Sequence, residues 1–138
     1  MPLWMAGGGP GLVDALTQTA VKKGVSIFYE TRATDLVYDG EKVLGVKAKC
    51  KGKQIEYKSK AVILGCGGFE ANPEMRTKYL GPGWDLAKVR GTRFNMGDGL
   101  NMALAIGACP YGNWSGRHAV SWERHAPEVG DLNIPESS

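Results

Sequence analysis

The chain has 138 residues, of which 43% are hydrophobic and 22% charged, and its formal net charge is +3. This length suits one domain with a real core, and the composition is ordinary for a globular protein. No run approaches the roughly 20 apolar residues that span a bilayer, so we expect no membrane insertion. The first few residues are too short for a signal peptide, so we expect a cytoplasmic protein.

The glycine and cysteine contents narrow the class further. Twenty glycines are about twice the usual share and follow no collagen-like period, which favours tight turns or contacts between backbone and ligand. Cys50, Cys66 and Cys109 show neither a zinc-binding spacing nor a pairing pattern, which predicts free thiols in a reducing compartment. Two histidines without spaced cysteines argue against a catalytic metal.

The first predicted element is a helix over residues 12–23. Leu12, Leu16 and Ala20 share one face at helical spacing, and Gly24 suits a left-handed C-terminal residue. The glycine-rich segment before it, residues 6–11, matches no phosphate-binding pattern. It is expected to be a flexible lead-in, serving either as the approach to the helix or as a turn that contacts a ligand.

Short extended runs follow the helix. They alternate between apolar and polar residues around tight turns, which is typical of an antiparallel meander. Their lysines are accompanied by no aromatic platform or basic helix, so they indicate a solvated face and no nucleic-acid partner. The predicted strands cover 25–30, 33–38, 43–50 and 53–59, with a break at Thr31 and Arg32.

The apolar run Ala61–Leu64 predicts a strand buried on both faces, as parallel strands are in α/β sheets. It runs directly into Gly65, Cys66, Gly67 and Gly68. Because the glycines lack side chains, backbone amides there can approach an anion or a ring edge. A plain tight turn is the alternative. Cys66 has no adjacent base, which argues against a nucleophile.

Two helices are predicted in the second half of the chain. Asn72 as cap and Pro73 in the first turn mark the start of the first helix. Irregular structure is expected at 84–96 and from Cys109 onward. The two helices cover 73–80 and 99–106, and disorder is expected at 133–138.

Asp98 lies between two glycines at the start of the second of these helices. Its carboxylate could cap the helix by accepting a hydrogen bond from an amide one turn in. It could instead accept a hydrogen bond from a sugar hydroxyl of a nucleotide, while like charge keeps it away from phosphate. The residues alone leave both readings open.

Arg117 and His118 are candidates for binding a substrate. Such a pair can hold a carboxylate by charge and hydrogen bonds. A loop histidine without a role is the alternative. Arg124 and His125 repeat the arrangement, but a plain loop explains them better.

Several short motifs follow one another in a characteristic order. Together they resemble the fumarate reductase/succinate dehydrogenase flavoprotein family of FAD-dependent oxidoreductases over about residues 7–120. Tricarballylate dehydrogenase-like proteins are the most similar branch, with 3-ketosteroid dehydrogenases as relatives. The motifs are Gly7-Gly8-Gly9, Glu30-Thr31-Arg32-Ala33-Thr34, Val43-Leu44-Gly45-Val46, the segment 61–72, Val89-Arg90-Gly91-Thr92, Gly97-Asp98-Gly99-Leu100 and Arg117-His118-Ala119.

The resemblance implies an α/β fold: a partial FAD/NAD(P)-binding (Rossmann-like) domain with a three-stranded antiparallel β-meander over residues 1–120. Residues 121–138 would begin a capping domain or form a disordered tail. The implied cofactor is FAD, with the backbone of Ala33 against the adenine. The resemblance places Gly65, Cys66 and Gly67 along the dinucleotide, Asp98 on FAD, and Arg117 and His118 at the substrate carboxylate.

Several of the family's motifs are expected to lie outside residues 1–138, and three positions within the chain differ from the family's pattern. The family's first strand and its Gly-x-Gly-x-x-Gly turn would precede residue 1. The capping domain and the proton-donating arginine would follow residue 138. Cys66 replaces the usual Ala, Ser or Thr, Met96 replaces the usual Thr, and His118 is about one residue out of register.

We therefore expect a fragment of an FAD-dependent oxidoreductase that is inactive by itself. Its parent would move a hydride between the flavin and a C–C bond of a carboxylate or keto substrate. One alternative is a nucleotide-binding module that acts alone. Another is a truncated, non-functional chain that self-associates as a homo-oligomer through unpaired strand edges.

Overall fold

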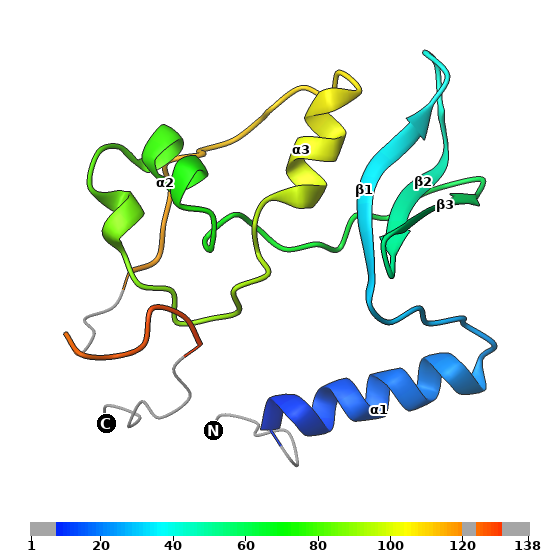
Figure 1. Cartoon of the computed structure of the whole chain (residues 1–138), viewed down its shortest axis with the longest axis horizontal. Coiled ribbons are helices and arrows are strands. Elements are labelled where there is room, and N and C mark those ends of the chain that lie inside the picture. The colour runs from blue at the N-terminus through cyan, green and yellow to red at the C-terminus, as the bar shows by residue number, and fades with distance from the viewer. Residues whose placement is uncertain (1–7, 120–123, 131–138) are drawn as a thin grey trace. The chain divides into compact units, whose positions relative to one another are not determined.

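The computed structural model describes residues 8–119 and 124–130, and the chain divides into two compact units, 1–31 and 32–138. The first unit contains α1, Gly8–Lys22 (Figure 1). This helix begins at Gly8 rather than Leu12, so the expected flexible lead-in is partly helical. Pro10 fits the first turn of α1, because the N–H that proline lacks needs no partner there. Gly24 is left-handed, with φ 81°, as predicted.

The strand predicted over residues 25–30 is absent. The segment has no regular structure, and Val25 is 53% exposed. Tyr29 and Glu30 form a turn, in which Glu30 has a φ of 51°. The prediction is wrong because β-propensity alone does not make a strand: the sheet among the described residues consists of β1, β2 and β3 and does not include this segment.

The predicted antiparallel meander is confirmed as one three-stranded sheet in the order β1-β2-β3 (Figure 1). In the β2–β3 hairpin, Cys50 lies opposite Lys53. Lys51 and Gly52 thus form a two-residue turn, and their φ values of 47° and 80° suit the type I′ turn of such hairpins. The strands are β1 (Thr31–Tyr38), β2 (Val43–Cys50) and β3 (Lys53–Lys58).

The break predicted at Thr31 and Arg32 is wrong. Both residues belong to β1, whose first four residues alternate between half-buried and exposed. The alternation that marks a strand therefore begins two residues before Ala33, at Thr31.

The run Ala61–Leu64 is neither a strand nor buried, contrary to the prediction. Ile63 is 94% exposed and Leu64 is 40% exposed. A strand buried on both faces needs strands beside it and layers above and below it. The only sheet among the described residues is the meander, so this apolar segment has no such neighbours.

The two predicted helices of the second half are confirmed, with ends within one residue of the prediction. Asn72 caps α2 by accepting a hydrogen bond from the amide of Met75 at 3.1 Å. Helix α3 begins one residue earlier than predicted, at Asp98. Their bounds are α2 (Pro73–Leu80) and α3 (Asp98–Ala105).

The remaining segments are irregular, as predicted, with two exceptions. The segment 84–96 begins with the short 3₁₀ helix η1 (Trp84–Leu86). In the same segment, Val89 forms an isolated parallel bridge with Val129. Of the predicted capping region or tail at 121–138, the structure describes residues 124–130. The disorder predicted at 133–138 lies outside the described residues.

Arg76 joins α2 to η1 from inside the second unit. It is only 7% exposed, the one buried charged residue among those described. Its guanidinium donates to four backbone carbonyls, which satisfies a charge that would otherwise be costly to bury. The acceptors are the carbonyl oxygens of Glu70 (2.6 Å), Trp84 (2.7 Å), Asp85 (2.8 Å) and Ala87 (3.1 Å).

Candidate functional site

The two glycine turns singled out in the sequence lie against each other. The amide of Gly97 donates to the carbonyl of Gly68 at 2.9 Å. Asn72, besides capping α2, donates from Nδ2 to the carbonyl of Met96 at 2.9 Å. These bonds fix the turn at residues 65–68 to the N-terminus of α3.

Two glycines of the second turn are tightly packed against neighbouring side chains. A β-carbon on Gly99 would lie 3.0 Å from Cβ and 3.1 Å from Sγ of Cys66. One on Gly97 would lie 2.5 Å from Sδ of Met75, and Gly97 is left-handed with φ 81°. The structure thus brings Cys66 into contact with the residue that follows Asp98.

Asp98 does not cap α3, so that reading is wrong. The N-cap is Gly97, and no side chain makes a capping hydrogen bond. Asp98 is the first residue of the helix, where a negative charge is favoured by the helix dipole. Its carboxylate accepts two hydrogen bonds from Arg32, one from Nε at 3.1 Å and one from Nη2 at 3.0 Å. This hydrogen bonding and the charge of Asp98 raise the pKa of the Arg32 guanidinium.

A pocket of about 460 Å³ opens between β1 and α3. The helix contributes residues at positions i, i+3, i+4 and i+7 from Asp98, which form one face. The strand contributes Ala33, so the predicted adenine contact and Asp98 line the same pocket. Its lining residues are Arg32, Ala33, Thr34, Asp35, Asp98, Asn101, Met102 and Ala105.

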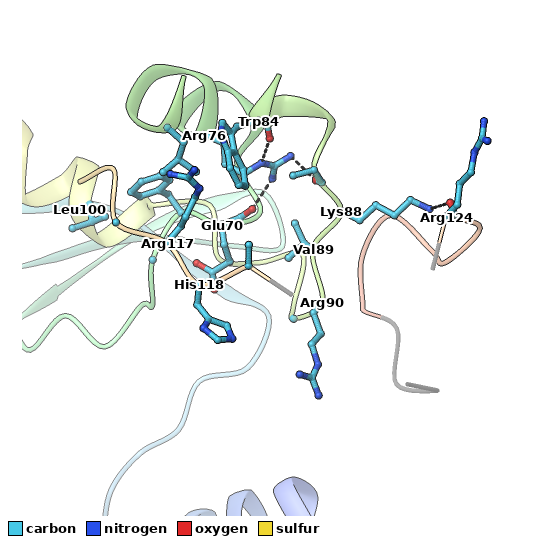
Figure 2. A pocket seen from close by; sticks show the side chains of 17 residues that line it. Glu70, Arg76, Trp84, Lys88, Val89, Arg90, Leu100, Arg117, His118 and Arg124 are labelled. Carbon is cyan, nitrogen blue, oxygen red and sulfur yellow. Dashed lines mark hydrogen bonds between the residues drawn. The ribbon is translucent and has the colours of Figure 1, made fainter. Parts of the chain in front are cut away.

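A second pocket, of about 890 Å³, lies beside the same two turns (Figure 2). Gly68, from the turn at residues 65–68, and Leu100, near the start of α3, both line it. Its walls include the apolar groups of Phe69, Leu80 and Val89, and Glu70 is its one acidic residue. Basic side chains outnumber it: Arg76, Lys88, Arg90, Arg117 and Arg124 line the pocket together with His118.

Arg117 and His118 both line the larger pocket but do not point to one place. The Arg117 guanidinium lies 4.1 Å from the centre of the Trp84 ring, a cation–π contact. Figure 2 shows the His118 ring directed away from Arg117. The two residues therefore reach different parts of the pocket.

Two of the basic residues in this pocket are engaged by the protein itself. Arg76 donates to backbone carbonyls, as described above, and Lys88 donates from Nζ to the carbonyl oxygens of Arg124 and Ala126. Arg90 is exposed and forms no such bond with any described residue. Arg117, besides its contact with Trp84, donates from Nη1 to the carbonyl of Ser115 at 3.4 Å. The other basic side chains that line the pocket, and that could meet an anionic ligand together with Arg117, are those of Arg90, His118 and Arg124.

Sequence reasoning missed three features of this region. Arg32 on β1 is one, because the residues Thr31–Thr34 are mostly polar and show no apolar alternation in the sequence. The buried role of Arg76 leaves no local sequence signal. An aromatic cluster holds the loop after Cys109 to α2: the ring of Trp114 lies 4.8 Å from Tyr79 and 6.3 Å from Phe69.

Metal chemistry finds no support in the part of the chain that the structure describes. No three residues among His, Cys, Asp and Glu gather there as ligands. The three cysteines are free, as predicted. Within the same residues, no helix is both long enough and apolar enough to cross a bilayer.

Comparison with known proteins gives matches over most of the chain. The family model of the FAD binding domain matches residues 3–115. The chain is 33% identical over 134 residues to 4-oxocyclohexanecarboxylate 2-dehydrogenase of Sinomonas cyclohexanicum, covering 90% of this chain and 23% of that protein. It is 29% identical over 101 residues to NADH:fumarate oxidoreductase of Klebsiella pneumoniae, covering 72% of this chain and 11% of that protein.

Among solved structures, the chain resembles the open conformation of a flavocytochrome c3 fumarate reductase. The TM-score is 0.71 at 28% sequence identity, and the match covers 78% of this chain and 19% of that one. The chain therefore spans between about a tenth and a quarter of the length of these relatives.

Proposed function

Because the chain belongs to the FAD binding domain family, we propose that it forms one side of the cofactor site of an FAD-dependent oxidoreductase. FAD is the cofactor of this family. One observation carries the proposal: the 65–68 turn and the N-terminus of α3 are in contact, and each contributes to a pocket. Gly68 and Leu100 line the larger pocket, and Asp98 lines the smaller one.

The residues present fit such a cofactor. In the smaller pocket, the backbone of Ala33 would bind the adenine, and Asp98 would accept a hydrogen bond from a sugar hydroxyl. Gly65, Cys66 and Gly67 would line the dinucleotide with backbone groups. A β-carbon on Gly65 would meet nothing within 4 Å, so this corner is open to a ligand. When bound, the flavin supplies hydride transfer, while these residues bind and orient it.

The larger pocket would receive the substrate, which we propose to be a carboxylate or keto compound. Its excess of basic over acidic residues supports an anion, and its apolar walls support a carbon skeleton. Two relatives bear the names of carboxylates, fumarate and 4-oxocyclohexanecarboxylate. Arg117 and His118 are the proposed carboxylate contacts. Tricarballylate, which the sequence resemblance suggests, is one candidate of this class.

We expect the 138-residue chain to bind FAD weakly and to have no dehydrogenase activity by itself. Stoichiometric flavin in the purified chain would contradict this. The DNA upstream of codon 1 provides the direct test of the parent. An in-frame strand, Gly-x-Gly-x-x-Gly turn and helix are expected, and their product should carry flavin absorbance. A frame encoding no such unit would overturn the proposal.

Self-association is a second candidate, favoured by the exposure of the apolar run 61–64 and by the sheet edges β1 and β3. Light scattering of the purified chain tests it, and a clean monomer would count against it. A nucleotide-binding module acting alone would instead bind FAD, ADP or NAD at micromolar concentrations in calorimetry. The free thiols support a reducing compartment, for which we propose the cytoplasm.

A further inference from the structure

We infer that Arg32 is a positioning residue of the cofactor site: it holds the Asp98 carboxylate in the orientation that a dinucleotide requires. The inference rests on the proposed function, because it assigns Arg32 a task at the same site. The two residues come from different elements, β1 and α3, and both line the smaller pocket.

The geometry is that of a two-point clamp. Nε of Arg32 donates to one carboxylate oxygen of Asp98, and Nη2 donates to the other. The planar guanidinium fork matches the carboxylate and fixes its rotation. A lysine ammonium is a single point charge and cannot set this orientation. Each carboxylate oxygen keeps a further lone pair with which it can accept a ligand hydroxyl.

Asp98 needs such a partner because, among the described residues, only Arg32 binds its carboxylate. Gly97, not Asp98, caps α3, so the usual capping bond is missing. A lone carboxylate beside the cofactor would also repel its pyrophosphate, whereas the paired group has no net charge. Arg32 thus orients the acceptor and offsets its negative charge at the same time.

The pair is poorly placed to stabilise the fold. The Arg32 side chain is 70% exposed and that of Asp98 is 35% exposed. Ion pairs as open to solvent as this contribute little to folding. Binding and stability should therefore separate: removal of Arg32 should weaken FAD binding while leaving the urea midpoint nearly unchanged.

The test measures FAD affinity of the 138-residue chain by flavin fluorescence anisotropy, with protein titrated into dilute FAD. The variants are R32Q, R32K, D98N and R32Q/D98N. The matched control is R93Q, because Arg93 lies over the Phe94 ring and lines neither pocket. We expect R32Q and R32K to raise the Kd for FAD about five- to tenfold. This corresponds to the loss of roughly one oriented hydrogen bond. R93Q should remain within about twofold of the wild type.

The double variant separates positioning from an independent contact. If Arg32 acts through Asp98, R32Q/D98N should bind FAD no more weakly than D98N. Three results would overturn the inference: R32Q that binds like R93Q, R32K that binds like the wild type, or fully additive losses in the double variant. These leave the proposed function intact. A parent protein that carries the upstream unit and binds no FAD would overturn both.

Discussion

Cys66 packs directly against Gly99, so that a β-carbon on Gly99 would lie 3.0 Å from Cβ of Cys66. The contact joins the end of the apolar run 61–64 to the first turn of α3. Asp98, the residue before Gly99, shares a pocket with Ala33 on β1. Three candidate cofactor contacts from distant parts of the sequence are thereby linked.

Replacement of Gly99 tests this packing. G99A should destabilise the chain by about 1 kcal/mol, because the added methyl group would lie 3.0 Å from Cβ of Cys66 and the Cys66 side chain has to give way. The measurement is the free energy of unfolding in urea. The matched control is G91A, since a β-carbon on Gly91 meets nothing within 4 Å.

A compensating change sharpens the result. C66G/G99A removes the Cys66 side chain that the new methyl group would meet, so it should recover part of the loss caused by G99A. If G99A unfolds at the same urea concentration as G91A, or if C66G/G99A shows no recovery, the two turns do not pack as described.

Asn72 links the cap of α2 to the second glycine turn. N72A should cost about 1–2 kcal/mol, because the amide of Met75 and the carbonyl of Met96 both lose their partner. N72S keeps a capping oxygen but no donor for Met96, so it should cost less. Urea unfolding of both variants measures the two contributions. Equal losses would show that the cap contributes nothing.

Arg76 should be the most sensitive charged residue in the second unit. R76M leaves four backbone carbonyls without their donor and should cost on the order of 3 kcal/mol. R76K should recover little, since one ammonium cannot reach four acceptors. The exposed Arg90 is the control, and R90M should change the urea midpoint only slightly. A tolerated R76M would contradict the assigned role.

Asp39 gives the turn between β1 and β2 a pH dependence. Its carboxylate accepts hydrogen bonds from the amides of Lys42 and Glu41, which lower its pKa below the ordinary value. A carboxyl whose pKa is lowered by folding stabilises the fold above its unfolded pKa, about 4. The stabilisation is lost as pH falls through the folded pKa.

Melting temperatures of the wild type and D39N between about pH 2 and pH 6 test this. Asparagine keeps an acceptor oxygen but does not titrate. The wild type should therefore lose more stability than D39N below about pH 4. Parallel curves for the two proteins would show that Asp39 has no such role.

Local patterns sufficed for much of this fold. Asn72 and Pro73 predicted the start of α2, and alternation around the Lys51-Gly52 turn predicted the β2–β3 hairpin. Both predictions were possible because caps and tight turns depend on neighbours in sequence. The strand predictions for residues 25–30 and 61–64 are wrong because a buried strand depends on residues far away in the sequence. The burial of these two runs depends on strands that must come from elsewhere, and no described segment supplies them.

The candidate site divides in the same way. The glycines at 65–68 and 97–99 could be singled out because they follow an apolar run and flank Asp98, which are features of the local sequence. That Asp98 binds Arg32, and does not cap its own helix, could not be foreseen. The choice depends on β1 lying beside α3, which is a tertiary relation without a local signature.

The central claim is that one FAD molecule contacts β1, the Cys66 turn and the start of α3 together. Titration of FAD into the ¹⁵N-labelled chain tests it most directly. The backbone amides of Ala33, Cys66 and Asp98 should shift together along one binding curve, while amides of the β2–β3 hairpin stay in place. Shifts at only one of the three, or separate curves with different Kd values, would contradict the account.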